Sequence, residues 1–540
     1  MNMSNRVAII GSGATSIYTL KFLLKSPYLL TLTVFEASSE VGMGMPYRKD
    51  MNADYMLCNA FSREIPVVTQ SLLDWLKELP KYELNEWELS SHELSARAFY
   101  PRLLIGEFLA HEFAKLCQQF KNKGHRVDIR SNERVTDIAV RDDGKINLTS
   151  ERSNQNYEFD QVVIASGHSW PTKPNIGTAE LFSPWPYTSV TALGIGNIGI
   201  LGSSLSAVDV VVALGSTHGT FTQCDETVLW QPNKNALNLK ITMLSKMGIM
   251  PEGDFYYPYP YIPLQIFSPK SVIAEVKKGP DGLVRRLFAL LCKELDNSAP
   301  QYLDSLGKDA QSIEGFSTAY FKNRQDLGGL AAVKKDFAEA RQSMREKKTV
   351  TYRYVLLRAH ENFDLALRDL TNEDWRLFSD CLAPIFSDSY AAVPHLSLAR
   401  IIAMFNAGVL SLEATGAEAV FKQKTDGRVY VKTATQRLRF DVMIDARGQS
   451  SAALDQLPFP SLVKILDPKT QPIKAPFRIK TLHPDPLSIY CLALPQILER
   501  HPFSQGLANC AENGKIVAET ILKDFSLQGT FPDKPILGKS

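Results

Sequence analysis

A glycine-rich turn between a strand and a helix near the start of the chain constrains its fold most. The turn reads Gly11-Ser12-Gly13-Ala14-Thr15-Ser16; it follows the β-branched run 6–10 and precedes an amphipathic segment at 17–24. In this dinucleotide-binding fingerprint, the first glycine allows a tight turn and the next lets the backbone approach a pyrophosphate at the helix N-terminus. The third fingerprint position holds Ser16 rather than glycine or alanine. The pattern predicts an α/β dinucleotide-binding domain at residues 1–190.

An acidic residue ends the next predicted strand, at 30–35. Glu36 lies 25 residues after Gly11, close to the spacing at which a carboxylate binds the ribose 2′-hydroxyl of a dinucleotide. The same carboxylate would repel a 2′-phosphate. The first domain is therefore predicted to hold FAD or NAD rather than NADP.

A second copy of the unit begins at 197. It carries Gly202-Ser203-Ser204 and Ala207, so that a serine replaces the middle glycine, and a plain strand–helix turn without a nucleotide stays open. The strand 240–244 ends in Ser245 and Lys246, where an NAD-binding unit would carry an acid. These two residues can bind a 2′-phosphate, which favours NADPH over NADH, although Lys246 is also readable as a solvated surface lysine.

A repeated return strand supports two units. Residues 159–167 read FDQVVIASG and residues 440–448 read FDVMIDARG, with Phe, Asp, Ala and Gly at matching positions. Self-similarity of this kind indicates repeated α/β units. The fold class predicted is α/β, with two Rossmann-like dinucleotide-binding domains, one for FAD and one for NAD(P), and an inserted helical segment.

The domain boundaries follow from the change in periodicity along the chain. We expect an FAD-binding domain at 1–190, an NAD(P)-binding unit at 191–275, a helical insertion at 276–406, and a return of the FAD domain with a C-terminal helix at 407–540. The helical periodicity and charge of 276–406 set the insertion apart from the strands on both sides.

The sequence resembles the FAD/NAD(P)-binding family of bacterial YdhS-like flavoproteins, within the two-dinucleotide-binding flavoproteins. The matching motifs are Gly11-Ser12-Gly13, Phe35-Glu36, the segments 42–47 and 100–102, Gly106, Ala165-Ser166-Gly167-His168, Pro184-Trp185, 202–209 and 245–251. Flavin monooxygenases are more distantly similar, and their F-x-G-x-x-x-H signature is not matched because Gly167 and His168 are adjacent.

The resemblance implies a set of flavin-site residues. A loop near the flavin would carry Gly44, Met45, Tyr47 and Asn59, with Arg102 at the start of the following helix, and the backbone of a residue such as Val135 pairs with the adenine edge in similar proteins. The turn after the return strand adds Ser166 and Gly167. His168 is the candidate catalytic residue, with a structural role as the alternative, and the N-terminus of a helix near 505–509 would point at the flavin.

Composition excludes several other classes of protein. The chain has 60 basic and 58 acidic residues, so its formal charge of +2 gives no general field for nucleic acid. Its seven cysteines include no C-x-x-C pair, and neither a metal-site motif nor a serine-hydrolase motif is present. No run reaches the roughly 18 apolar residues of a membrane helix. We expect a cytoplasmic protein with a small-molecule substrate, and its oligomeric state stays open.

Three functions remain open at this point. The first is an NAD(P)H-dependent flavin oxidoreductase, which includes a monooxygenase that hydroxylates a small amine or amino acid. The second is a flavin oxidase or dehydrogenase that has lost productive NAD(P) binding, for which Ser204 would be the reason. The third is a flavin-binding interaction protein without catalysis, in which the helical insertion contacts a partner.

Overall fold

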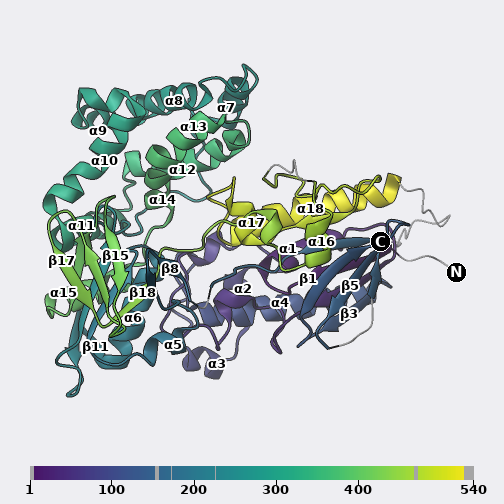
Figure 1. Cartoon of the computed structure of the whole chain (residues 1–540), viewed down its shortest axis with the longest axis horizontal. Helices are drawn as coiled ribbons and strands as arrows, with labels where there is room; N and C mark the ends of the chain where they lie inside the picture. Colours follow the sequence, from purple (N-terminus) through teal and green to yellow (C-terminus); the bar gives the residue numbers. More distant parts are fainter. Residues whose placement is uncertain (1–4, 153–156, 172, 225–226, 468–471, 528–540) are drawn as a thin grey trace. The chain divides into compact units, whose positions relative to one another are not determined.

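Two parallel sheets organise the chain, one in each of its two compact units (Figure 1). The computed structural model describes residues 5–152, 157–171, 173–224, 227–467 and 472–527. The first unit joins residues 1–169 to 449–540, and the second comprises 170–448. No described helix is both long and apolar enough to cross a membrane.

The first unit is built on the five-stranded parallel sheet β19-β7-β1-β2-β3. A three-stranded antiparallel sheet, β4-β5-β6, is separate from it. The strands are β1 (Asn5–Ile10), β2 (Leu30–Phe35), β3 (Arg126–Arg130), β4 (Val135–Val140), β5 (Ile146–Ser150), β6 (Tyr157–Phe159), β7 (Gln161–Ile164) and β19 (Ile489–Cys491). The helices are α1 (Ala14–Leu23), η1 (Met45–Tyr47), η2 (Ser62–Glu64), α2 (Leu72–Glu78), α3 (Lys81–Glu86), α4 (Arg102–Asn122), η5 (Leu454–Gln456), α16 (Pro460–Lys464), α17 (Leu494–Leu498) and α18 (Leu507–Leu527).

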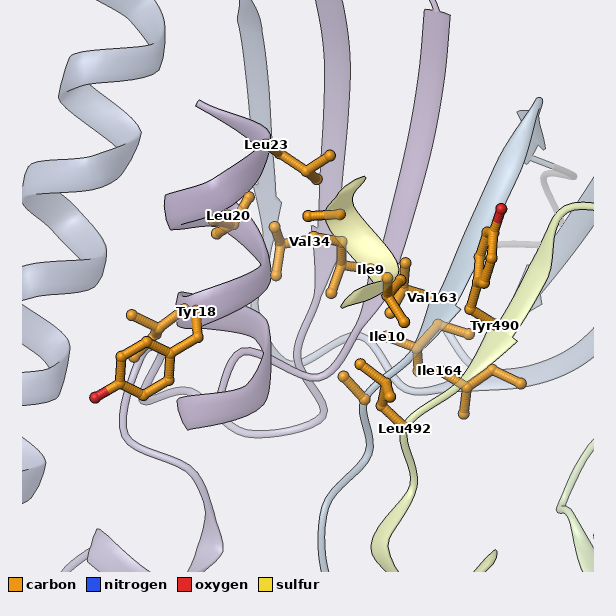
Figure 2. Close-up of a cluster of buried hydrophobic side chains, with 14 of the residues drawn as sticks. Ile9, Ile10, Tyr18, Leu20, Leu23, Val34, Val163, Ile164, Tyr490 and Leu492 are labelled. Carbon is orange, nitrogen blue, oxygen red and sulfur yellow. The ribbon is translucent and has the colours of Figure 1, made fainter. Parts of the chain in front are cut away.

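Strand β1 is central because its side chains are apolar on both faces. Residues 7–10 are all buried, as expected for a parallel strand covered by helices on both sides. Figure 2 shows Ile9 and Val34 from neighbouring strands beside Leu20 of α1, with Tyr490 of β19 in the same cluster. Helix α18 packs closely on α1, since a Cβ on Gly514 would lie 2.8 Å from the Thr19 nitrogen. This packing brings the C-terminal helix against the glycine turn.

The second unit is built on the parallel sheet β14-β13-β10-β18. Its strands are β8 (Asn175–Ile176), β9 (Ala179–Glu180), β10 (Asn197–Leu201), β11 (Gly219–Cys224), β12 (Thr227–Pro232), β13 (Lys240–Ser245), β14 (Leu410–Ala414), β15 (Val420–Gln423), β16 (Val429–Lys432), β17 (Arg437–Phe440) and β18 (Val442–Asp445). The helices are α5 (Tyr187–Thr191), α6 (Leu205–His218), α7 (Pro269–Val276), α8 (Leu283–Ser298), α9 (Pro300–Ser305), η3 (Lys308–Gln311), α10 (Ile313–Leu327), α11 (Gly329–Glu346), α12 (Thr351–Leu367), α13 (Asn372–Leu377), η4 (Phe378–Leu382), α14 (Ala383–Tyr390) and α15 (His395–Asn406).

The two units repeat one another down to single hydrogen bonds after their first strands. The Gly11 nitrogen donates to the carbonyl oxygen that ends β2, and the Gly202 nitrogen donates to that of Leu244 in β13, both at 2.7 Å. The nitrogens of Ala165 and Ala446, which follow the return strands, each donate at 2.8 Å to the last residue of the first strand. The predicted repeat of the strand–turn–helix unit is thus present in the structure.

In each unit, an aspartate before the return strand accepts a hydrogen bond from the start of the first strand. Asp160 accepts the Arg6 backbone N–H at 2.8 Å, and Asp441 accepts the Asn197 backbone N–H at 2.9 Å. These are the aspartates of the two FD motifs that precede β7 and β18. Each aspartate joins the first strand of its unit to the return strand beside it, so the repeated motif has the same structural role in both units.

The boundary predicted at 407 is wrong in the structure. Strand β14 pairs with β13, and β18 pairs with β10, so residues 407–448 belong to the second unit. The first unit resumes at Gln449. The physical reason is the repeat itself, since β18 takes the place beside β10 that β7 takes beside β1. The last 13 residues of the predicted segment 407–540 lie outside the described residues.

A cluster of buried charges joins the helices of the second unit to the segment after β13. Arg353, which is 1% exposed, contacts Glu252 at 2.5 Å. Arg324 binds Asp388 at 2.5 Å and lies 3.9 Å from a carboxylate oxygen of Asp336. Burial and, to a smaller extent, the nearby Glu252 carboxylate raise the pKa of Asp336 to about 7, against the lowering effect of Arg324. A carboxyl group with this pKa is about half protonated at neutral pH.

The wild-type chain is expected to become less stable as the pH rises and Asp336 ionises. We expect Asp336→Asn to abolish this decrease. The folded pKa of Asp336 lies above its unfolded value, so its contribution is fully present below about pH 4 and is lost as pH rises through about 7. Asparagine mimics the protonated carboxyl. Thermal unfolding is measured for both proteins at pH 5 and pH 8. Relative to wild type, the free energy of unfolding of the variant should be higher at pH 8 by on the order of 1–2 kcal/mol. An equal pH dependence in both proteins would contradict the assignment, and the exposed Asp326→Asn on α10 is the control.

Candidate dinucleotide site

A cavity of about 340 Å³ lies in the first unit around the glycine turn, at the lower end of the range for cofactor pockets. Twelve of the predicted site residues line it: Gly11, Gly13, Ala14, Thr15, Glu36, Gly44, Met45, Tyr47, Val135, Ser166, Gly167 and His168. Segments far apart in the sequence therefore meet at one place. Most of the site residues predicted for this unit therefore share one cavity. Their role as ligands of a cofactor stays a prediction.

The N-terminus of α1 opens into this cavity. Its N-cap, Gly13, has an extended backbone with φ −70° and ψ −170°, and no side chain caps the helix. Ala14 and Thr15, the first helical residues, line the cavity. Unpaired N–H groups and the positive end of the helix dipole make such a terminus a site for a phosphate group.

The close approach of the Gly44 loop favours glycine at position 13, apart from any contact with a bound ligand. A Cβ built on Gly13 would lie 3.1 Å from the Cα of Gly44, which has a φ of +79°. The Gly44 loop is held from behind by α4, because a Cβ on Gly106 would lie 2.3 Å from the carbonyl oxygen of Tyr47. The turn and the loop thus approach each other between fixed supports, and little room is left for any side chain.

Glu36 is held in place by the residues around it. Its Oε2 accepts hydrogen bonds from the Ser12 nitrogen at 3.0 Å and the Ser12 hydroxyl at 2.7 Å, while Oε1 accepts from the Ser38 nitrogen at 2.9 Å. The Arg48 guanidinium lies 4.0 Å from Oε1. A carboxylate oxygen can accept two hydrogen bonds, so Oε1 retains capacity for a hydroxyl group in the cavity. This fits the ribose contact predicted for Glu36.

Glu133 and Arg134 line the cavity next to Val135 but were missed from the sequence. The Glu133 nitrogen donates to the Glu36 carbonyl at 2.8 Å, which places this segment beside the end of β2. Burial acts to raise the pKa of Glu133, but hydrogen bonds from Ser150 and Tyr157 outweigh it, and the pKa is lowered. No local motif marks these residues, because their position depends on the pairing of β4 with β5.

The turn after β7 brings His168 to the cavity wall. Burial and, to a smaller extent, the positive charge of Arg102 lower the pKa of His168 to about 4, against the opposing effect of Gln449. The imidazole is therefore neutral at physiological pH. The Gly167 carbonyl accepts a hydrogen bond from the Leu494 nitrogen at 3.1 Å, which fixes this turn against α17.

Helix α18 begins at the cavity, close to the predicted position of 505–509. Gly506, Leu507, Cys510 and Asn513 line it. The Thr15 hydroxyl donates to the Cys510 sulfur at 3.3 Å, which joins α1 to α18 beside the glycine turn. Further lining residues that sequence reasoning missed are Pro458, Phe459, Leu492, Leu494, Ile497 and Ser504.

Three predicted residues do not line this cavity. The Ser16 hydroxyl donates to the Gly11 carbonyl at 2.7 Å and so braces the turn from within α1. Asn59 is exposed. Arg102 lies 3.4 Å from the Asn52 side-chain oxygen, and the Asn52 amide donates to the Met45 carbonyl at 3.4 Å. Arg102 thus acts on the cavity through Asn52 and through its charge.

The second unit brings its predicted residues to the equivalent turn. Ser204 is the N-cap of α6 with φ −95° and ψ −164°, a backbone close to that of Gly13, and its side chain is exposed. The Ser203 hydroxyl donates to the Ile249 carbonyl at 2.6 Å, and the Ser245 hydroxyl approaches the same oxygen at 3.5 Å. Gly202, Ser203 and Ser245 are therefore joined to the loop after β13, where Lys246 is exposed. Nucleotide binding here stays a prediction.

Two family models match separate parts of this chain. Residues 8–169 match the model of the FAD-NAD(P)-binding family, and residues 268–390 match that of the YdhS-like middle domain. The chain is 34% identical over 525 residues to the protein YdhS of Escherichia coli (strain K12), covering 96% of this chain and 98% of YdhS. The predicted cofactor class, FAD with NADPH or NADH, is that of the matched family.

Three solved enzymes match this chain at low identity and with TM-scores below 0.5. An ornithine N-hydroxylase from Kutzneria sp. 744 is 15% identical with a TM-score of 0.48, covering 97% of this chain and all of the other. An L-lysine 6-monooxygenase from Pseudomonas syringae is 14% identical with a TM-score of 0.45, covering 96% and 99%. A bacillithiol disulfide reductase from Bacillus cereus is 11% identical with a TM-score of 0.44, covering 97% and 100%.

Proposed function

Because this chain belongs to the YdhS-like family of FAD/NAD(P)-binding proteins, we propose that it is an FAD-dependent oxidoreductase that takes its electrons from NADPH or NADH. The observation that carries the proposal is the cavity of the first unit, where the uncapped N-terminus of α1 and the carboxylate of Glu36 line one space. These are the two groups that a dinucleotide requires, one for its pyrophosphate and one for its ribose.

The residues present fit FAD. Gly13 and Gly44 leave no side chain between the turn and the facing loop, and the N–H groups of Ala14 and Thr15 are available to an anion. Glu36 would hold the ribose, and Val135 and Glu133 would border the adenine end. When bound, FAD supplies a ring that accepts a hydride and passes the electrons on. The start of α18 would place a positive helix end beside that ring.

The second unit is proposed to bind the nicotinamide coenzyme. Support comes from the repeat of the turn at Gly202 and of the hydrogen bonds that flank it. Lys246, exposed at the end of β13, favours the 2′-phosphate of NADPH over NADH. The finer assignment, a monooxygenase that hydroxylates a small amine or amino acid, is one form that such an oxidoreductase takes, and the substrate is a small molecule.

One observation favours a second candidate function. Ser204 places a hydroxymethyl group where the first unit has Gly13, at the point where a dinucleotide backbone would come closest. A flavin oxidase or dehydrogenase reduced by its organic substrate, with a second unit that no longer binds NAD(P), accounts for this serine. The two candidates differ in whether NAD(P)H reduces the bound flavin.

The first test of the proposal is the flavin content of the purified chain. We expect one FAD per chain after gel filtration, measured as FAD released by denaturation against protein concentration. If the purified chain carries less, reconstitution with FAD should restore this ratio. A chain that binds no FAD even after reconstitution, while it remains folded by circular dichroism, would refute the proposed function.

A further inference from the structure

Arg447 occupies the place in the second unit that Ser166 occupies in the first. Each residue follows an alanine whose backbone nitrogen donates at 2.8 Å to the carbonyl oxygen that ends the first strand of its unit. Each also precedes a glycine with positive φ. A Cβ on Gly202 would lie 2.5 Å from the carbonyl oxygen of the alanine before Arg447, and one on Gly11 would lie 2.4 Å from that of the alanine before Ser166. The two residues are therefore equivalent neighbours of the two glycine turns.

The equivalent place in the first unit lines the dinucleotide cavity. Ser166 borders that cavity together with Gly11 and Gly13 of the turn. In the second unit the same place carries a guanidinium group instead of a hydroxyl group. Serine is short and neutral, whereas arginine offers a permanent positive charge and five N–H donors. The exchange thus adds positive charge beside the turn that is proposed to bind the nicotinamide coenzyme.

Asp445, at the end of β18, holds this guanidinium by one edge. The Arg447 Nε donates to Oδ1 of Asp445 at 2.8 Å, and Nη2 donates to Oδ2 at 2.7 Å. A planar guanidinium that gives this edge to a carboxylate keeps a second edge, formed by Nη1 and Nη2, for another anion. The Arg447 side chain is 49% exposed. A ligand from solvent can therefore reach a guanidinium whose position is already fixed by the protein.

The serine at the second turn explains why a side chain is suited to this contact. Ser204 is the N-cap of α6 and carries a Cβ where Gly13 has none, so a phosphate group is kept further from the N–H groups of the helix. An arginine on the return strand does not depend on that close approach of the backbone, because its long side chain extends to the anion. Arg447 can thus supply the donors that the turn itself loses.

We propose that Arg447 binds the diphosphate group of the nicotinamide coenzyme and replaces the close helix contact that Ser204 prevents. The proposal rests on the proposed function, in which the second unit binds NADPH or NADH. Its role differs from that of Lys246, because the two coenzymes share the diphosphate and differ only in the 2′-phosphate. Loss of Arg447 should therefore weaken the binding of both coenzymes by the same factor.

Calorimetric titration of the full-length, FAD-loaded protein with NADP⁺ and separately with NAD⁺ tests this role, since the oxidised coenzymes bind without reducing the flavin. Arg447→Gln should raise both Kd values by the same factor, roughly ten- to a hundredfold, as for a lost charge-assisted contact. Arg447→Lys should have a smaller effect, because lysine keeps the charge but not the second edge. Added salt should weaken binding less in Arg447→Gln than in the wild type.

Two further variants separate coenzyme binding from a merely structural ion pair. Asp445→Asn breaks the same pair as Arg447→Gln, but it leaves the guanidinium in place and should not raise either Kd. Arg428 binds Asp441 at the start of β18 at 3.0 Å, and its side chain is 44% exposed. Arg428→Gln therefore removes an equal charge at the other end of the same strand and should leave both Kd values unchanged.

Three results would overturn the role of Arg447: wild-type Kd values in a folded Arg447→Gln protein, an effect confined to NADP⁺, or equal weakening by Asp445→Asn. Reduction of the flavin by NADPH and NADH is measured on the same wild-type sample. If this reduction occurs while Arg447→Gln binds both coenzymes as the wild type does, only the role of Arg447 fails. If the wild type holds FAD but binds neither coenzyme, the proposed use of NAD(P)H fails together with it.

Discussion

Gly13→Val is expected to lose its bound FAD while Ser204→Val keeps it. A Cβ at position 13 already lies 3.1 Å from the Gly44 Cα, and the two methyl groups of valine add to this contact. The Gly44 loop cannot move away, because Gly106 of α4 lies against the Tyr47 backbone behind it. The side chain would therefore enter the space before the N-terminus of α1. A cost of about 1–3 kcal/mol for overpacking corresponds to a rise in Kd for FAD of roughly 5- to 150-fold.

Ser204→Val is the matched control because it stands at the same place in the other repeat. Ser204 has a similar extended backbone, already carries a Cβ and is exposed. Fluorescence titration of flavin-free protein with FAD measures both variants, and Gly13→Ala separates a clash from misfolding since its side chain is smaller. Wild-type affinity for FAD in a folded Gly13→Val protein would show that the pyrophosphate does not bind at this turn.

Gly202→Ala is expected to destabilise the second unit and leave FAD binding unchanged. Gly202 has a φ of +129°, and an added Cβ would lie 2.5 Å from the Ala446 carbonyl oxygen of the neighbouring return strand. Backbone strain and the clash with a paired strand cost about 2–5 kcal/mol together. Gly11→Ala should do the same in the first unit, where the Cβ would lie 2.4 Å from the Ala165 carbonyl oxygen, and it should also weaken FAD binding.

Glycines with positive φ but open surroundings are the controls for this prediction. Gly416 and Gly144 have φ values of +69° and +78°, and a Cβ on either would meet nothing within 4 Å. Thermal unfolding, with hydrogen exchange to locate the affected strands, should show a Tm lowered by roughly 5 °C or more for Gly202→Ala relative to Gly416→Ala. Equal effects at both positions would mean that the contact with the return strand contributes nothing.

The parts of the site that were predictable are those encoded within a short stretch of chain. The turn Gly11–Ser16 and Glu36 lie within one strand–helix–strand unit, so spacing alone predicted that they would meet. The repeat of FD and AxG motifs predicted the return strands. Each of these features depends on neighbours in one sheet, for which local sequence is sufficient.

Other parts depend on contacts between distant segments and were missed or misplaced. Cys510 meets Thr15 across 495 positions, and no local pattern marks a helix residue for that role. Glu133 reaches the cavity through the pairing of β4 with β5. The boundary at 407 was avoidable, because a second FD strand equivalent to β7 should pair with β10 in its own unit, as β18 does. The two hydrogen bonds between the Gln449 side chain and the Ser169 backbone join positions 280 residues apart, and only the three-dimensional structure reveals them.

Anaerobic mixing of the FAD-loaded protein with NADPH, and separately with NADH, tests the central claim most directly. We predict that at least one of the coenzymes bleaches the visible band of oxidised flavin, with NADPH faster, because a flavin oxidoreductase of this kind accepts a hydride from nicotinamide. Bleaching by an organic substrate alone would support the oxidase or dehydrogenase instead. If dithionite reduces the bound flavin while neither coenzyme does so at millimolar concentration, the claim that this chain is an NAD(P)H-dependent oxidoreductase is contradicted.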